Sequence, residues 1–325
     1  MPKAIVAHQT GGPEVLSYED IEVGAPAAGE VLIAHTAIGV NFLDTYYRSG
    51  VYPWKGAYPI IPGSEGSGRI LAVGEGVEDV KVGDRIAYTV PTGAYTEQRL
   101  LPADRVVKLP EAVDDKVAAA IILKGLTVQY LLFRTFRVKP GQTILFHAAA
   151  GGVGLLAGQW ASHLGATIIG TVSTPEKAAL ARQNGYHHVI NYKEENFVER
   201  VKEITGGEGV DVVYDSVGKD TYPHSFRCLK RLGMWVCFGQ SSGVIENFDL
   251  RHLAQNGSLF ATRPSLFNYI FTKEELQDAA QQLFEALERG ILNVAINQQL
   301  PLKEARKAHE MLEGRQTTGS TVLLL

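Results

Sequence analysis

A long segment without charged side chains limits the folds that this 325-residue chain can adopt. No Asp, Glu, Lys or Arg occurs between Lys139 and Glu176. Such a segment either spans a membrane or is buried inside a protein. Gly, His, Gln and Ser interrupt it, and no run reaches the ~18 to 20 apolar residues that a membrane-spanning helix needs. The segment is therefore predicted to be buried on both sides.

The uncharged segment divides into a strand, a turn, a helix and a second strand. Thr143–Phe146 and Thr167–Val172 are short apolar runs rich in β-branched residues, which is typical of central parallel strands. Apolar residues at helical spacing predict a helix between them, ended by Gly165: Val153, Leu156, Trp160 and Leu164. The glycine-rich turn 148–154 allows close approach of a ligand, and the helix amides that follow it favour a phosphate.

The turn is a variant of a dinucleotide-binding fingerprint. Ala148 stands where the usual pattern G-x-G-x-x-G has its first glycine, and the pattern here is A-x-x-G-x-x-G, ending at Gly154. A glycine-rich turn alone is often only a tight turn. The complete strand–turn–helix–strand unit favours nucleotide binding.

The end of the second strand bears on the choice of cofactor. An NAD site of this type has Asp or Glu there for the ribose hydroxyls, whereas this chain has Ser173, followed by Lys177. A hydroxyl and an ammonium favour a 2′-phosphate, which predicts NADPH rather than NADH. Alternatively, Thr174-Pro175-Glu176 is only a helix start with Lys177 as a surface charge; both interpretations can hold, because a helix N-terminus also favours phosphate.

Composition and chain organisation indicate a soluble α/β protein with two domains. Residues 1 to about 122 contain short strands separated by Gly and Pro, which predicts a compact barrel-like β domain. Strand and helix patterns then alternate up to about 262, as in a doubly wound parallel sheet. A long helical pattern at 115–136, interrupted by Gly125, leads into this second domain. Past about 262, a capping box at Thr272 and Glu275 predicts a helix start, and 291–296 is strand-like. These remaining residues are predicted to return to the first domain. The beginning of the sequence has no secretory pattern, so the cytoplasm is the expected compartment.

The sequence lacks the residue patterns that several kinds of chemistry require. The nine histidines include no H-x-x-x-H or H-E-x-x-H, so no metal is predicted. No G-x-S-x-G occurs, and Cys237 in an apolar strand is expected to be an inert thiol. Net charge is −4, which gives no basic field for nucleic acid.

Tyrosines cluster near Asn41, in and after a short helix predicted at 44–48. Tyr47 and Tyr58 are expected to be packing residues. Tyr46 and Tyr52 are candidates to cover a flat, carbonyl-bearing substrate, with their hydroxyls as hydrogen-bond donors or acids.

The motifs together resemble a known family over nearly the whole chain: His8–Leu16, Gly39–Asp44, Pro62–Gly68, Ala148–Gly154, Tyr214–Gly218 and Phe238-Gly239. They are similar to those of quinone oxidoreductases of the zeta-crystallin kind, in the medium-chain dehydrogenase/reductase superfamily. Zinc-dependent members have Gly-His-Glu at Gly63-Ser64-Glu65, a cysteine before the Asp at 44, and a four-cysteine lobe. The resemblance therefore implies the zinc-free branch.

The resemblance also implies a fold and a site. It implies a GroES-like catalytic domain at 1–125, a Rossmann NADPH-binding domain at 126–262 and a C-terminal return at 263–325. Asn41, Thr127 and Tyr130 are expected near the nicotinamide. The other cofactor residues that it implies are Gly151, Gly152 and Val153 at the pyrophosphate, Ser173, Lys177 and Tyr192 at the adenosine phosphate, and Phe238, Ser241, Arg263 and Ser265 on the other side. A homodimer is expected through the last Rossmann strand, near 258–261.

NADPH-dependent reduction of quinones by hydride transfer is the predicted function, with Tyr46, Tyr52 and Asn41 on the catalytic side. Reduction of the C=C bond of enals or enones by the same machinery is the alternative within enzymes. A crystallin-like or RNA-binding role is the alternative of another class, which the charge disfavours. No membrane partner is predicted.

Overall fold

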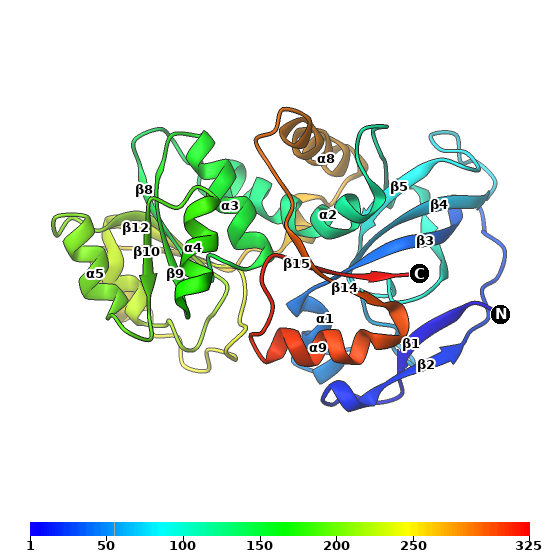
Figure 1. Ribbon diagram of the computed structural model, residues 1–325, viewed down its shortest axis with the longest axis horizontal. Coiled ribbons are helices and arrows are strands. Elements are labelled where there is room, and N and C mark those ends of the chain that lie inside the picture. Colours follow the sequence, from blue (N-terminus) through cyan, green and yellow to red (C-terminus); the bar gives the residue numbers. More distant parts are fainter. Residues whose placement is uncertain (55) are drawn as a thin grey trace. The chain divides into compact units, whose positions relative to one another are not determined.

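The computed structural model describes residues 1–54 and 56–325. The chain forms two compact units (Figure 1). Unit 1 comprises Met1–Leu126, Ile270–Glu288 and Val294–Leu325, and unit 2 comprises Thr127–Tyr269 and Arg289–Asn293. Tyr58, which was expected to be a packing residue, is 49% exposed.

Unit 2 is built around a parallel six-stranded sheet of order β10-β9-β8-β11-β12-β13. The strands are β8 (Thr143–Phe146), β9 (Thr167–Val172), β10 (His188–Asn191), β11 (Val210–Asp215), β12 (Leu229–Cys237) and β13 (Phe260–Thr262). The helices are α3 (Gly152–His163), α4 (Pro175–Gln183), α5 (Phe197–Ile204), α6 (Arg251–Gln255) and α7 (Leu266–Tyr269), with a 3-10 helix at His224–Cys228. The predicted doubly wound arrangement is thus present.

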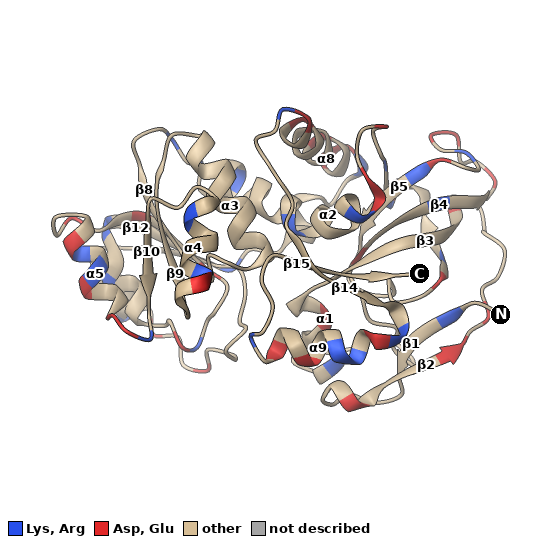
Figure 2. Cartoon of the chain, viewed as in Figure 1, with Lys and Arg blue, Asp and Glu red and all other residues tan. Residues whose placement is uncertain are grey.

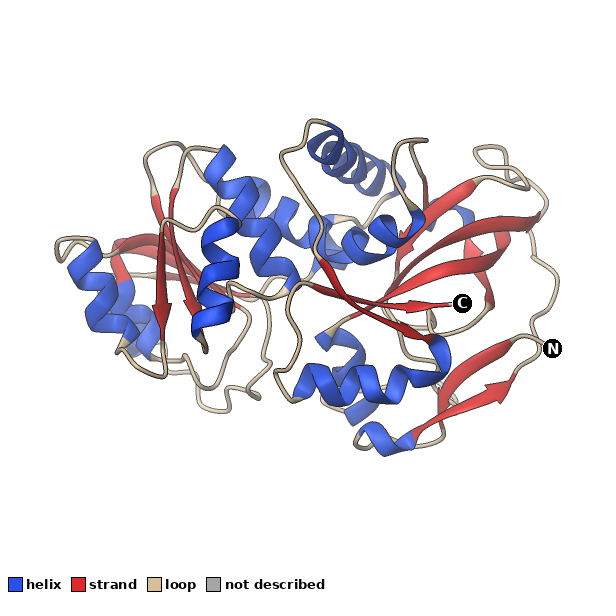
Figure 3. Cartoon of the chain, viewed as in Figure 1, coloured by secondary structure: helices blue, strands red, loops and turns tan. Residues whose placement is uncertain are grey.

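Helices cover both faces of this sheet (Figure 3). Side chains alternate between the faces of a strand, so Ile169 and Gly170 of β9 point opposite ways. Ile169 packs in one apolar cluster with Val198 and Val201 of α5. Gly170 faces Tyr186, which follows α4; a Cβ there would lie 2.6 Å from the tyrosine ring. Burial on both sides explains why β8 and β9 carry no charge (Figure 2).

Unit 1 contains a mixed seven-stranded sheet. Its order is β14-β15-β3-β4-β5-β7, and β6 also pairs with β3. The strands are β3 (Glu30–Val40), β4 (Glu65–Val73), β5 (Arg85–Thr89), β6 (Gln98–Pro102), β7 (Val106–Lys108), β14 (Ile296–Pro301) and β15 (Ser320–Leu324), and a separate hairpin is formed by β1 (Lys3–Ala7) and β2 (Leu16–Asp20). Strands from the two ends of the chain therefore share one sheet, because β15 pairs with β3.

Among the described residues, unit 1 contains four α-helices, and one of them, α2 (Asp115–Tyr130), continues into unit 2. The others are α1 (Phe42–Ser49), α8 (Lys273–Glu288) and α9 (Ala305–Glu313), and 3-10 turns lie at Pro13–Val15, Ala103–Arg105 and Leu302–Glu304. A π-helical turn, Leu131–Thr135, extends α2. The combined segment Asp115–Thr135 is long and apolar enough to cross a membrane, but 83% of its apolar window is buried within the protein, as in a core helix.

Two local predictions are wrong. We expected Gly125 to interrupt the helix 115–136, but α2 runs through it without a break. Gly125 instead allows close packing: a Cβ there would lie 2.4 Å from Leu283 of α8. We also expected a strand at 291–296, whereas β14 begins at Ile296 and ends at Pro301.

Candidate functional site

The carboxyl ends of the unit 2 strands lie along one edge of the sheet, because all neighbouring pairs are parallel. Strand order reverses between β8 and β11, and open sheets of this kind bind ligands at that point. Most predicted cofactor residues of unit 2 follow these strand ends: Gly151, Gly152, Val153, Ser173, Lys177, Tyr192, Phe238, Ser241, Arg263 and Ser265.

The turn after β8 has the geometry of a phosphate cradle. Ala148 adopts a left-handed conformation with φ 57°, and Gly151 is the extended N-cap of α3. A Cβ on Gly154 would lie 2.4 Å from the carbonyl oxygen of Ala148, so only glycine lets α3 approach the turn this closely. The N-terminal amides of the twelve-residue helix α3 are thereby held beside the strand end, where they suit an anion.

The residues predicted at the adenosine phosphate are brought together at the ends of β9 and β10. The backbone N–H of Tyr192 donates to the carbonyl of Val172 at 3.0 Å, which places Tyr192 next to Ser173. Thr174 caps α4 by accepting from the Lys177 N–H at 3.3 Å. The predicted helix start is therefore present. The binding of a phosphate by Ser173 and Lys177 stays a prediction.

Asp215, at the end of β11, organises the next turn, a role that we did not predict for it. Its Oδ1 accepts from the N–H groups of Val217 (2.8 Å) and Gly218 (3.0 Å). Its Oδ2 accepts from the Thr221 hydroxyl at 2.7 Å and from the Trp235 indole at 3.1 Å. This buried carboxylate thus fixes the turn that follows β11.

Phe238 and Ser241 are fixed by backbone bonds to that same turn. The Phe238 N–H donates to the Asp215 carbonyl at 2.8 Å, and the Ser241 N–H donates to the Ser216 carbonyl at 3.1 Å. A Cβ on Gly239 would lie 2.6 Å from that Ser216 oxygen, so the two strand ends are in close contact.

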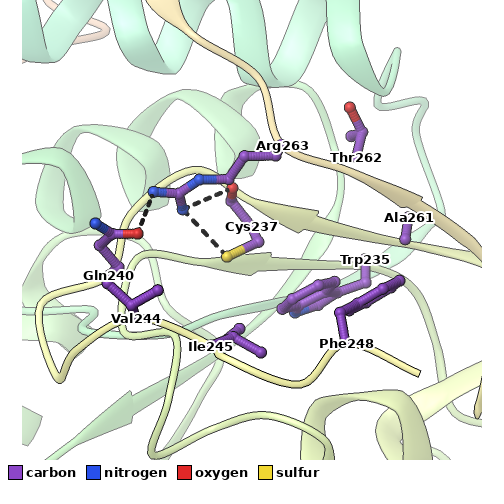
Figure 4. A pocket seen from close by; sticks show the side chains of 9 residues that line it. All are labelled: Trp235, Cys237, Gln240, Val244, Ile245, Phe248, Ala261, Thr262 and Arg263. Atoms are coloured by element: carbon purple, nitrogen blue, oxygen red, sulfur yellow. Dashed lines mark hydrogen bonds between the residues drawn. The ribbon is translucent and has the colours of Figure 1, made fainter. Parts of the chain in front are cut away.

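A pocket of about 370 Å³ opens at the ends of β12 and β13 (Figure 4). Its lining is mostly apolar: Trp235, Cys237, Gln240, Val244, Ile245, Phe248, Ala261, Thr262 and Arg263. Arg263 donates to the carbonyl of Gly239 at 2.6 Å and to the side-chain oxygen of Gln240 at 3.0 Å. The guanidinium therefore braces the loop that follows β12. Ser265 is exposed near the start of α7, outside the pocket lining.

Cys237 in this pocket is not an activated thiol. Burial raises the pKa of the Cys237 thiol to about 11. The charge of Asp215 adds a smaller increase, and the lowering effect of Arg263 does not offset this rise. The thiol is therefore protonated at neutral pH, when it is a poor nucleophile.

Thr127 and Tyr130, predicted at the nicotinamide, are buried on the last turn of α2. The Tyr130 ring stacks on the ring of Tyr269, with centroids 4.4 Å apart and planes 14° apart. Their contact with a cofactor stays a prediction.

In unit 1, Asn41 is the N-cap of α1 and sits in a buried polar network. The Asn41 N–H donates to Asp44 at 2.8 Å, and the Ser64 hydroxyl donates to the same carboxylate at 2.7 Å. Tyr95 donates to Asp44 as well, at 3.0 Å. Burial raises the pKa of Asp44 to about 6, and these donors oppose the rise. The Asn41 backbone and the Ser64 hydroxyl thus take part in one hydrogen-bond network around Asp44.

Glu65 and Lys124 form an ion pair that the sequence did not reveal. The ammonium of Lys124 lies 2.5 Å from Glu65 Oε1, and both side chains are almost completely buried. The side-chain amide of Asn41 donates to the same oxygen at 2.9 Å, and the Leu123 N–H donates to Oε2 at 2.7 Å. A signal was present, because Lys124 is the one charged residue between Lys116 and Arg134.

Tyr46 and Tyr52 are close neighbours. Their ring centroids are 5.3 Å apart, and the Tyr52 N–H donates to the Tyr46 carbonyl at 3.0 Å. Both side chains are half-buried, which leaves part of each ring accessible. Tyr47 packs edge-on against Tyr52 at 5.7 Å, consistent with the packing role expected of it.

Comparison with known proteins identifies the family. Residues 27–111 match the family model described as alcohol dehydrogenase GroES-like domain, and residues 152–286 match zinc-binding dehydrogenase. A quinone oxidoreductase of Pseudomonas aeruginosa is 52% identical over 325 residues, covering 100% of both chains. The chain belongs to the quinone oxidoreductase family. This confirms the resemblance and the predicted fold class, a GroES-like domain with a Rossmann parallel-sheet domain.

Two further proteins resemble this chain. One is described in complex with a cofactor, and the other is named for a different substrate. The structure of Escherichia coli quinone oxidoreductase complexed with NADPH has a TM-score of 0.97 and 49% identity, covering 99% of this chain and 100% of that one. A 2-haloacrylate reductase of a Burkholderia species is 48% identical, covering 100% of this chain and 99% of the relative.

Proposed function

We propose that the protein is an NADPH-dependent reductase of quinones. The observation that carries this proposal is the strand edge of unit 2, where a glycine cradle, a helix N-terminus and Ser173 with Lys177 meet. This set suits a dinucleotide that carries a 2′-phosphate. The relatives named quinone oxidoreductase, one of them in complex with NADPH, support the same conclusion.

The proposed roles follow the chemistry of each residue. Bound NADPH would supply a hydride to the acceptor. Gly151, Gly152 and Val153 would hold the pyrophosphate by their backbone, while Ser173, Lys177 and Tyr192 would hold the adenosine phosphate. Further cofactor contacts are proposed for Asn41, Thr127, Tyr130, Phe238, Ser241, Arg263 and Ser265. Arg263 braces the loop after β12, so its proposed contribution to cofactor binding is to hold this loop in place.

Consumption of NADPH with a panel of quinones tests this function. We expect turnover with simple benzoquinones and naphthoquinones, measured as the loss of NADPH absorbance. A parallel panel of enals, enones and 2-haloacrylates tests the second candidate, C=C reduction, which the 48% identical 2-haloacrylate reductase favours. Failure with every quinone would overturn the first candidate.

We also infer that the reaction needs no zinc. Asn41 and Ser64, at the positions where the zinc-dependent branch carries ligands, donate to Glu65 and Asp44. An amide nitrogen and a hydroxyl are poor zinc ligands beside thiolate and imidazole. Among residues 1–54 and 56–325, no group of three or more His, Cys, Asp or Glu is arranged to hold a metal ion. We expect treatment with a strong chelator to leave turnover unchanged, and stoichiometric zinc in active protein would contradict this.

Tyr46 and Tyr52 are proposed to cover the acceptor ring. Hydroquinone oxygens can take protons from water, so Phe substitution of either tyrosine is expected to lower turnover by tenfold at most. That is roughly the effect of one lost neutral hydrogen bond, ~0.5–1.5 kcal/mol. A proton-donating role would instead cost ~100-fold or more. Measuring turnover and NADPH binding of both Phe variants with one quinone separates these cases, and a thousandfold fall with unchanged NADPH binding would contradict the proposed role.

We further infer a cytoplasmic homodimer. Strand β13 is an edge of the parallel sheet, and its Phe260 is 57% exposed, which leaves a surface for pairing with a second copy. Both cysteines, Cys228 and Cys237, are free thiols, consistent with a reducing compartment. Sedimentation analysis of the Phe260→Asp variant tests the interface; an unchanged dimer would contradict it.

A further inference from the structure

The ammonium of Lys124 has hydrogen-bonding capacity that its known contacts do not use. A lysine ammonium carries three N–H donors. Within residues 1–54 and 56–325, Glu65 Oε1 is the one acceptor that Lys124 contacts. Lys124 is only 5% exposed, so bulk water does not solvate the other two N–H groups freely. A buried cation with two N–H groups left over is costly, and such groups are normally met by ordered water or a ligand.

Neutralising Glu65 does not by itself explain this arrangement. Glu65 is fully buried and also accepts from the Leu123 N–H and from the Asn41 amide. A neutral hydrogen-bond donor on α2 would satisfy an uncharged Gln at 65, and that pair would avoid the desolvation of two charges. Lys124 instead places a full positive charge next to Asn41, and its three N–H groups exceed what the contact with Glu65 uses.

We propose that Lys124 is a catalytic residue whose ammonium binds the oxygen of the acceptor and stabilises the negative charge that develops on it. This inference rests on the proposed function, which puts Asn41 beside the reacting groups. Asn41 and Lys124 share Glu65 Oε1, so an acceptor oxygen close to Asn41 lies within reach of the ammonium.

The charge changes of the reaction fit a fixed cation. A quinone that gains a hydride receives one proton and two electrons, and it carries one negative charge on oxygen until a proton from water completes the hydroquinone. An enone reduced in the same way holds its charge on the enolate oxygen. Lys124 keeps its proton throughout and contributes a charge-assisted hydrogen bond in a site that excludes water. The substrate class that follows is a conjugated carbonyl compound whose oxygen can hold the charge.

A pair of variants separates this role from a structural one. Lys124→Met leaves Glu65 buried without its counter-ion and is expected to destabilise the fold. The double variant Lys124→Met/Glu65→Gln removes both charges and is expected to recover folding. If Lys124 acts on the acceptor, turnover with 1,4-benzoquinone stays ~100- to 1,000-fold below that of the unmodified protein in the double variant, with little change in the KM for NADPH. Recovery of full turnover would show that the ammonium only neutralises Glu65.

A binding measurement provides a readout that does not depend on turnover. 4-Nitrophenol, titrated into the full-length protein with NADP⁺ present, reports its ionisation by visible absorbance. We expect the unmodified protein to bind the phenolate at least tenfold more tightly than the phenol, and the double variant to lose this preference. Equal affinity for both forms, or no binding, in the unmodified protein would overturn the proposal.

A matched control lies on the same helix. Lys116 is exposed at the start of α2, and Lys116→Met is expected to change neither turnover nor phenolate binding. An equal loss of phenolate preference in this variant would show a general charge effect and overturn the assignment to Lys124. If the unmodified protein prefers the phenolate yet reduces no quinone, the oxyanion site of Lys124 is supported and the proposed function is wrong.

Discussion

Replacement of Asp215 by alanine is expected to lower the free energy of unfolding by roughly 4 kcal/mol or more. The carboxylate accepts from the N–H groups of Val217 and Gly218, the Thr221 hydroxyl and the Trp235 indole. Asp215 is fully buried, so alanine leaves these donors without partners, and each unsatisfied buried group costs ~1–3 kcal/mol. The turn after β11 and the strand end of β12 lose their common anchor.

Thermal unfolding followed by circular dichroism and tryptophan fluorescence measures this effect. For a unit of this size a loss of 4 kcal/mol lowers the Tm by roughly 10 °C. Asp215→Asn keeps one acceptor oxygen and is expected to lose less. Glu208→Ala, an exposed acidic position of the same unit, serves as the control with no expected change. A Tm for Asp215→Ala within ~2 °C of the unmodified protein would contradict the anchoring role.

The region around the uncharged segment could be predicted because local patterns determine it. Burial on both faces of the parallel sheet requires apolar strands, and the change from β-branched runs to helical spacing marks the boundaries of β8, α3 and β9. The predicted capping box at Thr272 and Glu275 is also local, and the structure contains both of its hydrogen bonds.

The elements that we predicted wrongly depend on long-range contacts. β14 is a polar edge strand whose position is set by parallel pairing with β15, so the more apolar run before it misled the prediction. Gly125 looks like a helix breaker until the neighbouring Leu283 is known. The partners Glu65 and Lys124 stand 59 positions apart, and no periodicity links them.

Substitution of Lys177 by alanine is expected to raise the KM for NADPH by about 10- to 100-fold and to leave the KM for NADH nearly unchanged. A hydrogen bond to a charged group contributes ~1.5–3 kcal/mol, and each 1.4 kcal/mol is a factor of ten in affinity. The 2′-phosphate is the one group that distinguishes the two cofactors, so loss of its counter-charge affects NADPH alone. Initial rates with a single quinone, measured against each cofactor, give both constants.

Introducing a negative charge at Ser173 sharpens the same test. Ser173→Asp places a carboxylate at the end of β9, where it repels a 2′-phosphate but can accept from the ribose hydroxyls of NADH. Combined with Lys177→Ala, it is expected to reverse the preference toward NADH. Lys139 precedes β8 at the opposite edge of the sheet, and Lys139→Ala removes an equal charge without an expected effect on either cofactor. Equal losses for NADPH and NADH in the Lys177 variant would mean that this ammonium supports α4 rather than binding the phosphate.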